Sequence, residues 1–254
     1  METVWIIGAG KFGLRAAKLL AKQGGAYKIT IVDQDRESLK QAGELGCRTE
    51  TADAVDFLVD HLPPGEGTDR LASDQLNSDR INSDRIRSER VTSDRKLPDW
   101  IVPAVPVHLA WEWCLRSLGP DRIAPEDLPG EMEALLPNPM RGAGPDLYVS
   151  HADFLCPPNC NEPDDKCTKT GEPRKEDMFR RLAGIAFSGI TPFVIQSIQL
   201  GPGVGGYRPR TLMDVRDRIS RHRGDFFLAT ACRCHGVLSG GCIRGILHTA
   251  ERQL

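Results

Sequence analysis

The sequence predicts an α/β protein with a doubly wound, mainly parallel sheet. Between Thr3 and His61, short apolar runs alternate with segments whose apolar residues recur at helical spacing. This is the pattern of parallel strands joined by helices. A glycine-rich turn follows the first apolar run, and an acidic residue ends the second. Each of these features has a defined place in such a fold.

The glycine-rich turn has the spacing that binds a dinucleotide. A strand at 3–7 leads into Gly8-Ala9-Gly10-Lys11-Phe12-Gly13, a helix is predicted over 12–23, and a strand at 28–32 follows. In this unit the glycines allow a tight turn and close approach of the pyrophosphate, and the helix N-terminus attracts phosphate. The fold is therefore expected to be Rossmann-like. The expected dinucleotide contacts are Gly8, Gly10, Lys11, Phe12, Gly13, Asp33 and Gln34.

The acid at the end of the second strand predicts which cofactor binds. Asp33 stands twenty residues after Gly13, where a carboxylate accepts hydrogen bonds from the adenosine ribose. A carboxylate repels a 2′-phosphate, so we expect NAD rather than NADP. Arg36 lies near enough in sequence to soften that preference.

The N-terminal part also resembles a known family. A helix at 37–45, a strand at 47–51 and a helix at 53–61 complete its pattern. Residues 4–58 are similar to the TrkA N-terminal family, the RCK nucleotide-binding domain that regulates potassium transport. The resemblance rests on Gly8 to Gly13, on Ile31-Val32-Asp33 and on Ala52-Asp53-Ala54-Val55-Asp56. It implies a Rossmann fold, NAD(H) binding and a non-catalytic regulatory role.

Residues 63–97 interrupt the pattern. After Pro63-Pro64-Gly65 come five tandem pentads, from Leu71 to Arg95, with one apolar residue in each. That spacing forms no apolar stripe on a helix and alternates faces on a strand. A pentapeptide β-helix would need a small residue where these pentads carry Asp or Glu. We therefore expect a flexible, charge-balanced insertion.

The fold resumes at Pro98. We expect a strand at 100–105, a helix at 107–118, an extended connection at 119–145 and a strand at 147–150. Residues 1–62 and 98–150 are therefore assigned to the dinucleotide-binding domain, and 151–254 to a cysteine-bearing α/β segment. The elements expected in that segment are a helix at 178–186, a strand at 193–198, a plain turn at 201–207, a helix from 211, a strand at 225–231 and a helix at 243–251.

Two groups of cysteines in the second half predict a metal centre. Cys156, Cys160 and Cys167 lie in a polar, proline-stiffened loop that no apolar pattern would pack. Cys232 and Cys234, followed by His235, come at the end of an apolar strand. If all strands join one parallel sheet, both groups reach the sheet edge that also carries the glycine loop. The predicted ligands are Cys156, Cys160, Cys167 and Cys234, with Cys232 or His235 as the alternative fourth.

The kind of metal is left open by this pattern. Four thiolates suit an iron–sulfur cluster, which we favour, and also zinc; redox-active or buried thiols without metal are the third reading. Cys47 and Cys114 lie in apolar patterns and are expected in the core. Cys242 is expected at a helix N-terminus, where thiol pKa values fall.

Composition narrows the function classes. The chain has 254 residues and a formal net charge of −2, with no basic excess for nucleic acid. No export signal or membrane span is recognised, so a cytoplasmic protein is expected. The leading hypothesis is an NAD-dependent oxidoreductase or electron-transfer protein with a redox partner or small-molecule substrate. The alternative is an NAD(H)-sensing regulator, and a homo-oligomer is compatible with either.

Overall fold

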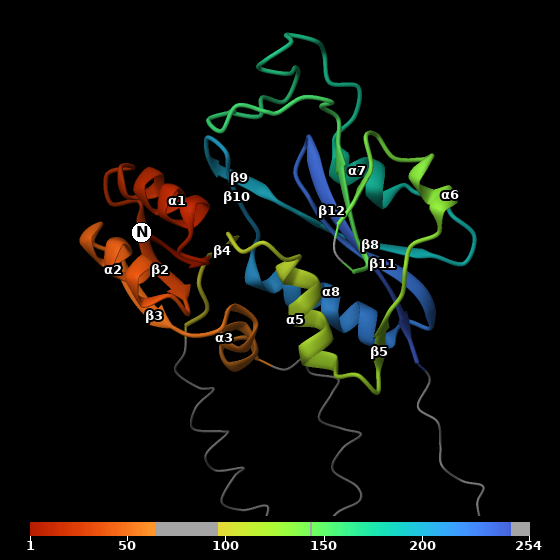
Figure 1. The fold of residues 1–254 in the computed structure, drawn as a ribbon, viewed down its shortest axis with the longest axis horizontal. Helices are drawn as coiled ribbons and strands as arrows, with labels where there is room; N and C mark the ends of the chain where they lie inside the picture. The colour runs from red at the N-terminus through yellow and green to blue at the C-terminus, as the bar shows by residue number, and fades with distance from the viewer. Residues whose placement is uncertain (64–95, 143, 245–254) are drawn as a thin grey trace, which may run out of the picture. The chain divides into compact units, whose positions relative to one another are not determined.

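The computed structural model describes residues 1–63, 96–142 and 144–244 (Figure 1). Contacts divide the chain into two units, Met1–Ala104 with Arg208–Asp217 and Val105–Tyr207 with Arg218–Leu254. The predicted insertion and its pentads lie almost wholly outside the described residues. The boundary at 150 drawn from the sequence differs from this division, because the strand before it pairs with strands of the second unit.

The first unit contains a four-stranded parallel sheet in the order β3-β2-β1-β4. This confirms the Rossmann-like fold. Its elements are β1 (Glu2–Ile7), α1 (Lys11–Ala21), β2 (Tyr27–Asp33), α2 (Arg36–Glu44), β3 (Arg48–Thr51), α3 (Ala54–His61) and β4 (Trp100–Pro103).

Helices cover both faces of this sheet. α1 contacts β1 and β2, and α2 contacts β2 and β3 as well as α1. The first three strands follow one another from β1 toward the β3 edge, whereas β4 lies on the opposite side of β1. Because parallel crossovers are right-handed, the connection from β3 to β4 places α3 on the other face of the sheet. There Trp5 of β1 meets Phe57 of α3 edge to face, with ring centroids 4.9 Å apart. The strand order reverses at β1, the place where such sheets bind ligands.

The starts of the three helices differ in a way that bears on binding. Asp35 caps α2 and Asp53 caps α3, each accepting hydrogen bonds from two backbone N–H groups. α1 begins at Gly10, which has no side chain to cap it. The first N–H groups of α1 therefore remain available to an anion.

The second unit contains a larger, mainly antiparallel sheet, in the order β6-β7-β12-β11-β8, with β5 also paired to β12. The one parallel pair of this sheet is β8 with β11. α7 packs against β8, β11 and β12, and α5 packs against β5 and β11. The elements are α5 (Leu109–Leu118), β5 (Ile123–Pro125), α6 (Gly130–Glu133), β6 (Met140–Arg141), β7 (Asp146–Ser150), α7 (Met178–Ala183), β8 (Thr191–Gln196), β9 (Ile198–Gly201), β10 (Val204–Gly206), β11 (Gly224–Ala231) and β12 (His235–Ile243). By the same division, α8 (Pro209–Arg221) belongs to the first unit up to Asp217 and to the second from Arg218.

Two expectations for the second half were wrong, and a third agrees with the structure. Its strands form their own sheet rather than joining one parallel sheet. The segment at 119–145 is not a plain connection, because it contains β5, α6 and β6. The glycine-rich stretch at 201–207 is part of the β9–β10 hairpin, turning at Gly203 with φ 67°. That hairpin agrees with the plain turn favoured over a phosphate loop.

The most consequential correction concerns the last strand. Ser239-Gly240-Gly241-Cys242 was expected to lead into a helix at 243–251, but these four residues and Ile243 lie inside β12, which pairs with β11 from Gly224 to Ala231. From residue 245 on, the expected helix lies outside the described residues. The glycines fit because neighbours press against this strand. A Cβ on Gly240 would lie 2.4 Å from the Glu126 carbonyl oxygen, and one on Gly241 would lie 2.5 Å from the Trp111 ring. Cys242 is therefore a strand residue, and the predicted effect of a helix N-terminus does not apply.

Candidate dinucleotide and metal sites

The glycine loop has the geometry that a dinucleotide needs. Gly8 has φ 110°, a conformation that residues with a side chain rarely adopt. A Cβ on Gly13 would lie 1.8 Å from the Gly8 carbonyl oxygen, so only glycine fits where α1 meets the loop. A Cβ on Gly10 would meet nothing within 4 Å among the described residues. The loop thus combines one glycine with a positive φ, one tightly packed glycine and one open glycine.

The carboxylate of Asp33 lies directly beside this loop. One of its oxygens accepts a hydrogen bond of 2.5 Å from the backbone N–H of Ala9, and the other accepts one of 2.9 Å from Asp35. The backbone N–H of Gly8 also bonds the carbonyl of Val32. Because each carboxylate oxygen has two lone pairs, Asp33 retains capacity for ribose hydroxyls.

The other predicted contacts lie around the same loop. Lys11 and Phe12 are exposed at the start of α1, and Phe12 is 69% exposed although it is a large apolar side chain. Gln34 donates a hydrogen bond of 2.7 Å from Nε2 to Asp53, the cap of α3. Arg36 is exposed in the first turn of α2. Asp53 is not among the dinucleotide contacts predicted from the sequence.

In the second unit the two cysteine groups come together. The β11–β12 turn, Cys232 to His235, lies against the long loop between β7 and α7, drawn in green to teal in Figure 1. The Cys156 sulfur lies 3.4 Å from Nε2 of His235, and the Cys232 sulfur lies 3.8 Å from Nδ1 of the same ring. Ligand atoms of Glu162, Cys232 and His235 all lie within 4.8 Å of one another.

The remaining predicted thiols make hydrogen bonds with nearby polar groups. The Cys160 sulfur accepts from the N–H of Glu162 and lies 3.1 Å from the Thr168 hydroxyl. The backbone N–H groups of Thr170 and Lys169 lower the pKa of Cys167. The Cys234 sulfur accepts from the guanidinium of Arg174 at 3.2 Å.

Burial is the largest influence on the pKa values of three of these thiols, Cys156, Cys232 and Cys234. It raises the pKa of Cys156 and Cys234, and it raises the pKa of Cys232 to about 12 with help from the Glu162 carboxylate. Burial also lowers the pKa of His235. Burial thus favours neutral thiols and a neutral imidazole when the protein is free of metal.

Two residues of this region were missed from the sequence. Glu162 has φ 46°, a left-handed conformation that is uncommon for a residue with a side chain. Its Oε1 accepts hydrogen bonds from the N–H groups of Arg233 and Cys234. The side chain of Arg174 is only 6% exposed and donates to the carbonyl of Pro163 as well as to Cys234. Nothing in the sequence distinguished them from neighbouring charged residues.

The other cysteines lie elsewhere. Cys114 is fully buried in α5, as expected of a core cysteine. Cys47 is partly buried before β3, and burial raises its pKa. Cys242 is partly buried in β12, where burial and then Asp225 raise its pKa.

Comparison with known proteins gives a family for the chain. A family model described as "Uncharacterized protein, C-terminal domain", AF_1314_C, matches residues 110–244, more than half of the 254 residues. The chain belongs to this family. The matched range contains all five predicted metal-site cysteines, His235 and Glu162. The AF_1314_C domain thus begins within α5 and ends just after β12.

The N-terminal part and a relative give two further likenesses. The TrkA-N domain model matches residues 4–59, which confirms the resemblance found in the sequence, and TrkA-N domains bind dinucleotides. An "Uncharacterized protein" of Archaeoglobus fulgidus is 28% identical over 238 residues, covering 92% of this chain and 96% of that protein. The likeness to this relative therefore extends over both units.

Among the described residues, no helix is both long and apolar enough to cross a bilayer.

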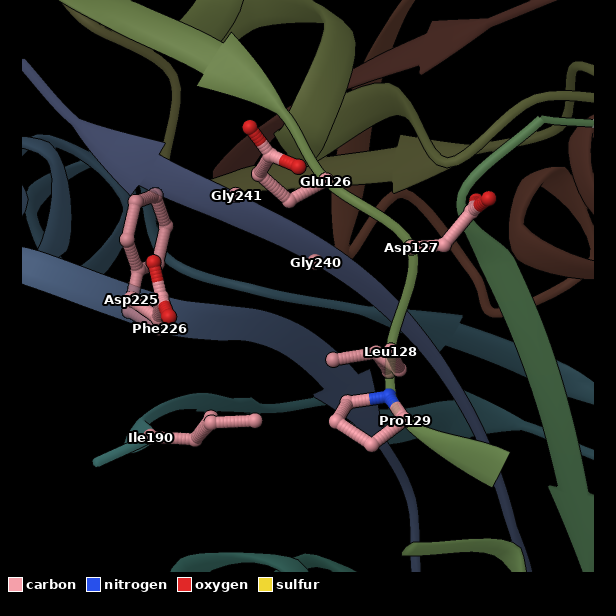
Figure 2. Close-up of a pocket in the computed structure, with 9 residues that line it drawn as sticks. All are labelled: Glu126, Asp127, Leu128, Pro129, Ile190, Asp225, Phe226, Gly240 and Gly241. Carbon is pink, nitrogen blue, oxygen red and sulfur yellow. The ribbon is translucent and has the colours of Figure 1, made fainter. Parts of the chain in front are cut away.

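A small cavity lies beside β12 in the AF_1314_C domain (Figure 2). Its volume is about 110 Å³, and its lining includes Glu126, Asp225 and Gly240. Pockets that enclose a cofactor or drug-sized ligand usually measure ~300 Å³ or more. The cavity therefore suits water better than a substrate.

A buried histidine predicts how acid affects the stability of the second unit. His108 is 3% exposed, and its Nδ1 lies 2.7 Å from the Ser239 hydroxyl, which donates to Asp146. Nδ1 must therefore carry the proton, and burial lowers the pKa of His108 to about 3. Unfolding restores the ordinary pKa of about 6.5. His108 therefore does not change the free energy of unfolding above pH 6.5. Between pH 6.5 and 3 the unfolded chain binds a proton that the folded protein does not, so the free energy of unfolding falls by at most ~1.4 kcal/mol per pH unit.

The variant His108→Asn tests this expectation. Asparagine retains an N–H donor near Ser239 and does not titrate. Urea unfolding measured from pH 7.5 to 4 should show a shallower loss of stability on acidification in the variant than in the wild type. Parallel pH profiles would contradict the assignment.

Proposed function

We propose that this protein binds NAD(H) and acts in the cytoplasm as a redox protein, either an NAD-dependent oxidoreductase or an electron-transfer protein. The observation that carries the proposal is the open glycine of the first unit. Gly10 leaves free space at the start of α1, where no side chain caps the helix. The Asp33 carboxylate accepts a hydrogen bond from the backbone N–H of Ala9, the residue before Gly10. Pyrophosphate and ribose need these two features side by side.

A cysteine-ligated metal centre in the second unit is the other part of the proposal. Its support is that two thiols 76 residues apart in sequence, Cys156 and Cys232, meet at one imidazole, with one carboxylate beside Cys232 and that ring. Thiolates hold either an iron–sulfur cluster or zinc. An iron–sulfur cluster would transfer electrons, whereas zinc would hold the loop or bind a substrate.

The alternative function is a regulator that senses the NAD(H) state without catalysis. The match of residues 4–59 to the TrkA-N domain favours it, because related domains of potassium transport systems regulate rather than catalyse. Anaerobically purified protein should be incubated with NADH and a general electron-acceptor dye. Oxidation of NADH at multiple turnovers would support the redox protein, and binding without turnover would support the regulator.

Cofactor preference tests the dinucleotide site. Calorimetry should show tighter binding of NADH than of NADPH, because Asp33 accepts from the ribose hydroxyls and repels a 2′-phosphate. Asp33→Asn should weaken NADH binding by ~10-fold or more, the value of a hydrogen bond to a charged group, and should narrow the difference between the two cofactors.

Asp60→Asn, a change on the exposed surface of α3, is the matched control and should leave both affinities unchanged. Equal affinity of the wild type for NADH and NADPH would show that a cation such as Arg36 governs the site instead.

A further inference from the structure

The side chains around His235 form a donor set that differs from the four cysteines predicted from sequence. His235 starts β12, and the three-residue turn before it returns Cys232 to the same ring. The long loop contributes Cys156 at 3.4 Å from Nε2 and Glu162 within 4.8 Å of Cys232 and His235. One thiol, one imidazole and one carboxylate thus approach one another from two segments of the chain, and Cys156 lies at the other nitrogen of the ring.

These distances are close to those between ligands of one metal ion. Zinc binds sulfur at about 2.3 Å and nitrogen or oxygen at about 2.0–2.2 Å, in a tetrahedron. Ligand atoms of such a tetrahedron lie roughly 3.5 Å apart by geometry. The separation of 3.8 Å between the Cys232 sulfur and Nδ1 of His235 is close to that spacing. Cys156 lies at the other ring nitrogen, Nε2, and one imidazole binds an ion through one nitrogen, so Cys156 accepts the Nε2–H hydrogen bond and leaves Nδ1 for the ion.

The backbone holds two of these donors in place. The Cys232 sulfur accepts the N–H groups of Cys234 and His235 at 3.4 and 3.3 Å, which supports a thiolate. Oε1 of Glu162 accepts hydrogen bonds from two backbone N–H groups of the β11–β12 turn, so Oε2 is left for a metal. The left-handed φ of Glu162 directs the carboxylate of this loop residue to that turn.

Positive charge keeps Cys234 apart from this set. Its sulfur accepts a hydrogen bond from the guanidinium of Arg174, which also donates to the loop carbonyls of Pro163 and Asp164. Cys160 and Cys167 bond polar groups of their own loop. These three thiols are therefore expected to support the loop rather than to bind the ion.

We propose that Cys232, Nδ1 of His235 and Glu162 bind one zinc ion, and that Cys156 holds the His235 ring through Nε2. The inference rests on the metal centre of the proposed function and names its ligands and its metal. Imidazole and carboxylate donors with one thiolate suit a single borderline-soft cation, whereas an iron–sulfur cluster is usually held by four thiolates. The zinc would join the long loop, which contains little regular structure, to the end of the β11–β12 hairpin.

Metal analysis of the full chain tests the proposal. The wild type, purified anaerobically, should contain about one zinc per chain and no iron. Cys232→Ser and His235→Ala should each lose most of the zinc. Cys160→Ser, Cys167→Ser and Cys242→Ser should retain it, and Cys242 is the matched control because it lies on the same strand as His235.

Substitution with Co²⁺ provides a readout that a folding defect would not imitate. In the wild type, Co²⁺ should show the visible bands of a tetrahedral site with a thiolate ligand. His235→Cys should still bind Co²⁺, but with a stronger sulfur-to-metal band, because a second thiolate replaces the imidazole. Retained NADH binding, measured by calorimetry, shows that the first unit is folded in each variant.

The outcomes separate this inference from the proposed function. Iron with sulfide, lost in Cys160→Ser and Cys167→Ser but not in His235→Ala, would overturn the zinc site and leave a cysteine-ligated centre standing. Absence of every metal from the wild type, with failure to bind added Zn²⁺, would overturn both. NADH binding remains a separate test of the first unit.

Discussion

Gly10→Val should abolish measurable NADH binding and leave the protein folded. The valine Cβ meets nothing within 4 Å among the described residues, and Gly10 has φ −66° and ψ −170°, an extended conformation that valine adopts readily. The side chain would instead fill the space where the pyrophosphate approaches the backbone. We expect calorimetry to show at least a ~100-fold loss of affinity, about 2.7 kcal/mol.

Two other glycines separate binding from folding. Gly43→Val in α2 is the matched control, because its Cβ also meets nothing within 4 Å among the described residues, and NADH affinity should be unchanged. Gly13→Ala should destabilise the first unit instead, since its Cβ would lie 1.8 Å from a backbone oxygen. Full NADH affinity in Gly10→Val would show that the dinucleotide does not lie against this loop.

Gly240→Ala should give the largest loss of stability in the second unit. The added Cβ would lie 2.4 Å from the Glu126 carbonyl oxygen and 2.9 Å from the Leu128 side chain. Figure 2 shows the segment of Glu126 and Leu128 running past Gly240 on β12. The backbone cannot withdraw easily, because the N–H of Glu126 bonds the Gly240 carbonyl at 3.0 Å. Overpacking of this kind costs ~3 kcal/mol or more.

Calorimetric melting measures this effect. A loss of that size lowers the melting temperature by roughly 6–12 °C in a unit of this size. Gly130→Ala, at the start of α6 in the same unit, meets nothing within 4 Å among the described residues and should change the melting temperature little. Similar melting of both variants would mean that residues 239–242 do not form the described strand.

The fold of the first unit could be predicted from the sequence because its determinants are local. Short apolar runs, glycines at fixed spacing and capping acids act within a few residues, and a βαβ unit joins neighbouring segments in a right-handed way. The match to the TrkA-N domain and the parallel sheet confirm that prediction. The residues assigned to the dinucleotide stay predictions, although Gly8, Gly13 and Asp33 have the geometry that such a site requires.

The second unit depends on contacts that no local pattern contains. The sequence determined that Cys156, Cys160 and Cys167 form one group and that Cys232 and Cys234 form another. Only the tertiary structure decided that β11 turns back as a hairpin, which makes Gly240 and Gly241 strand residues packed against Glu126 and Trp111. The same hairpin turn brings Cys232 to His235 and sets Cys234 against Arg174, because the turn's backbone conformation and the opposing loop decide where each sulfur points.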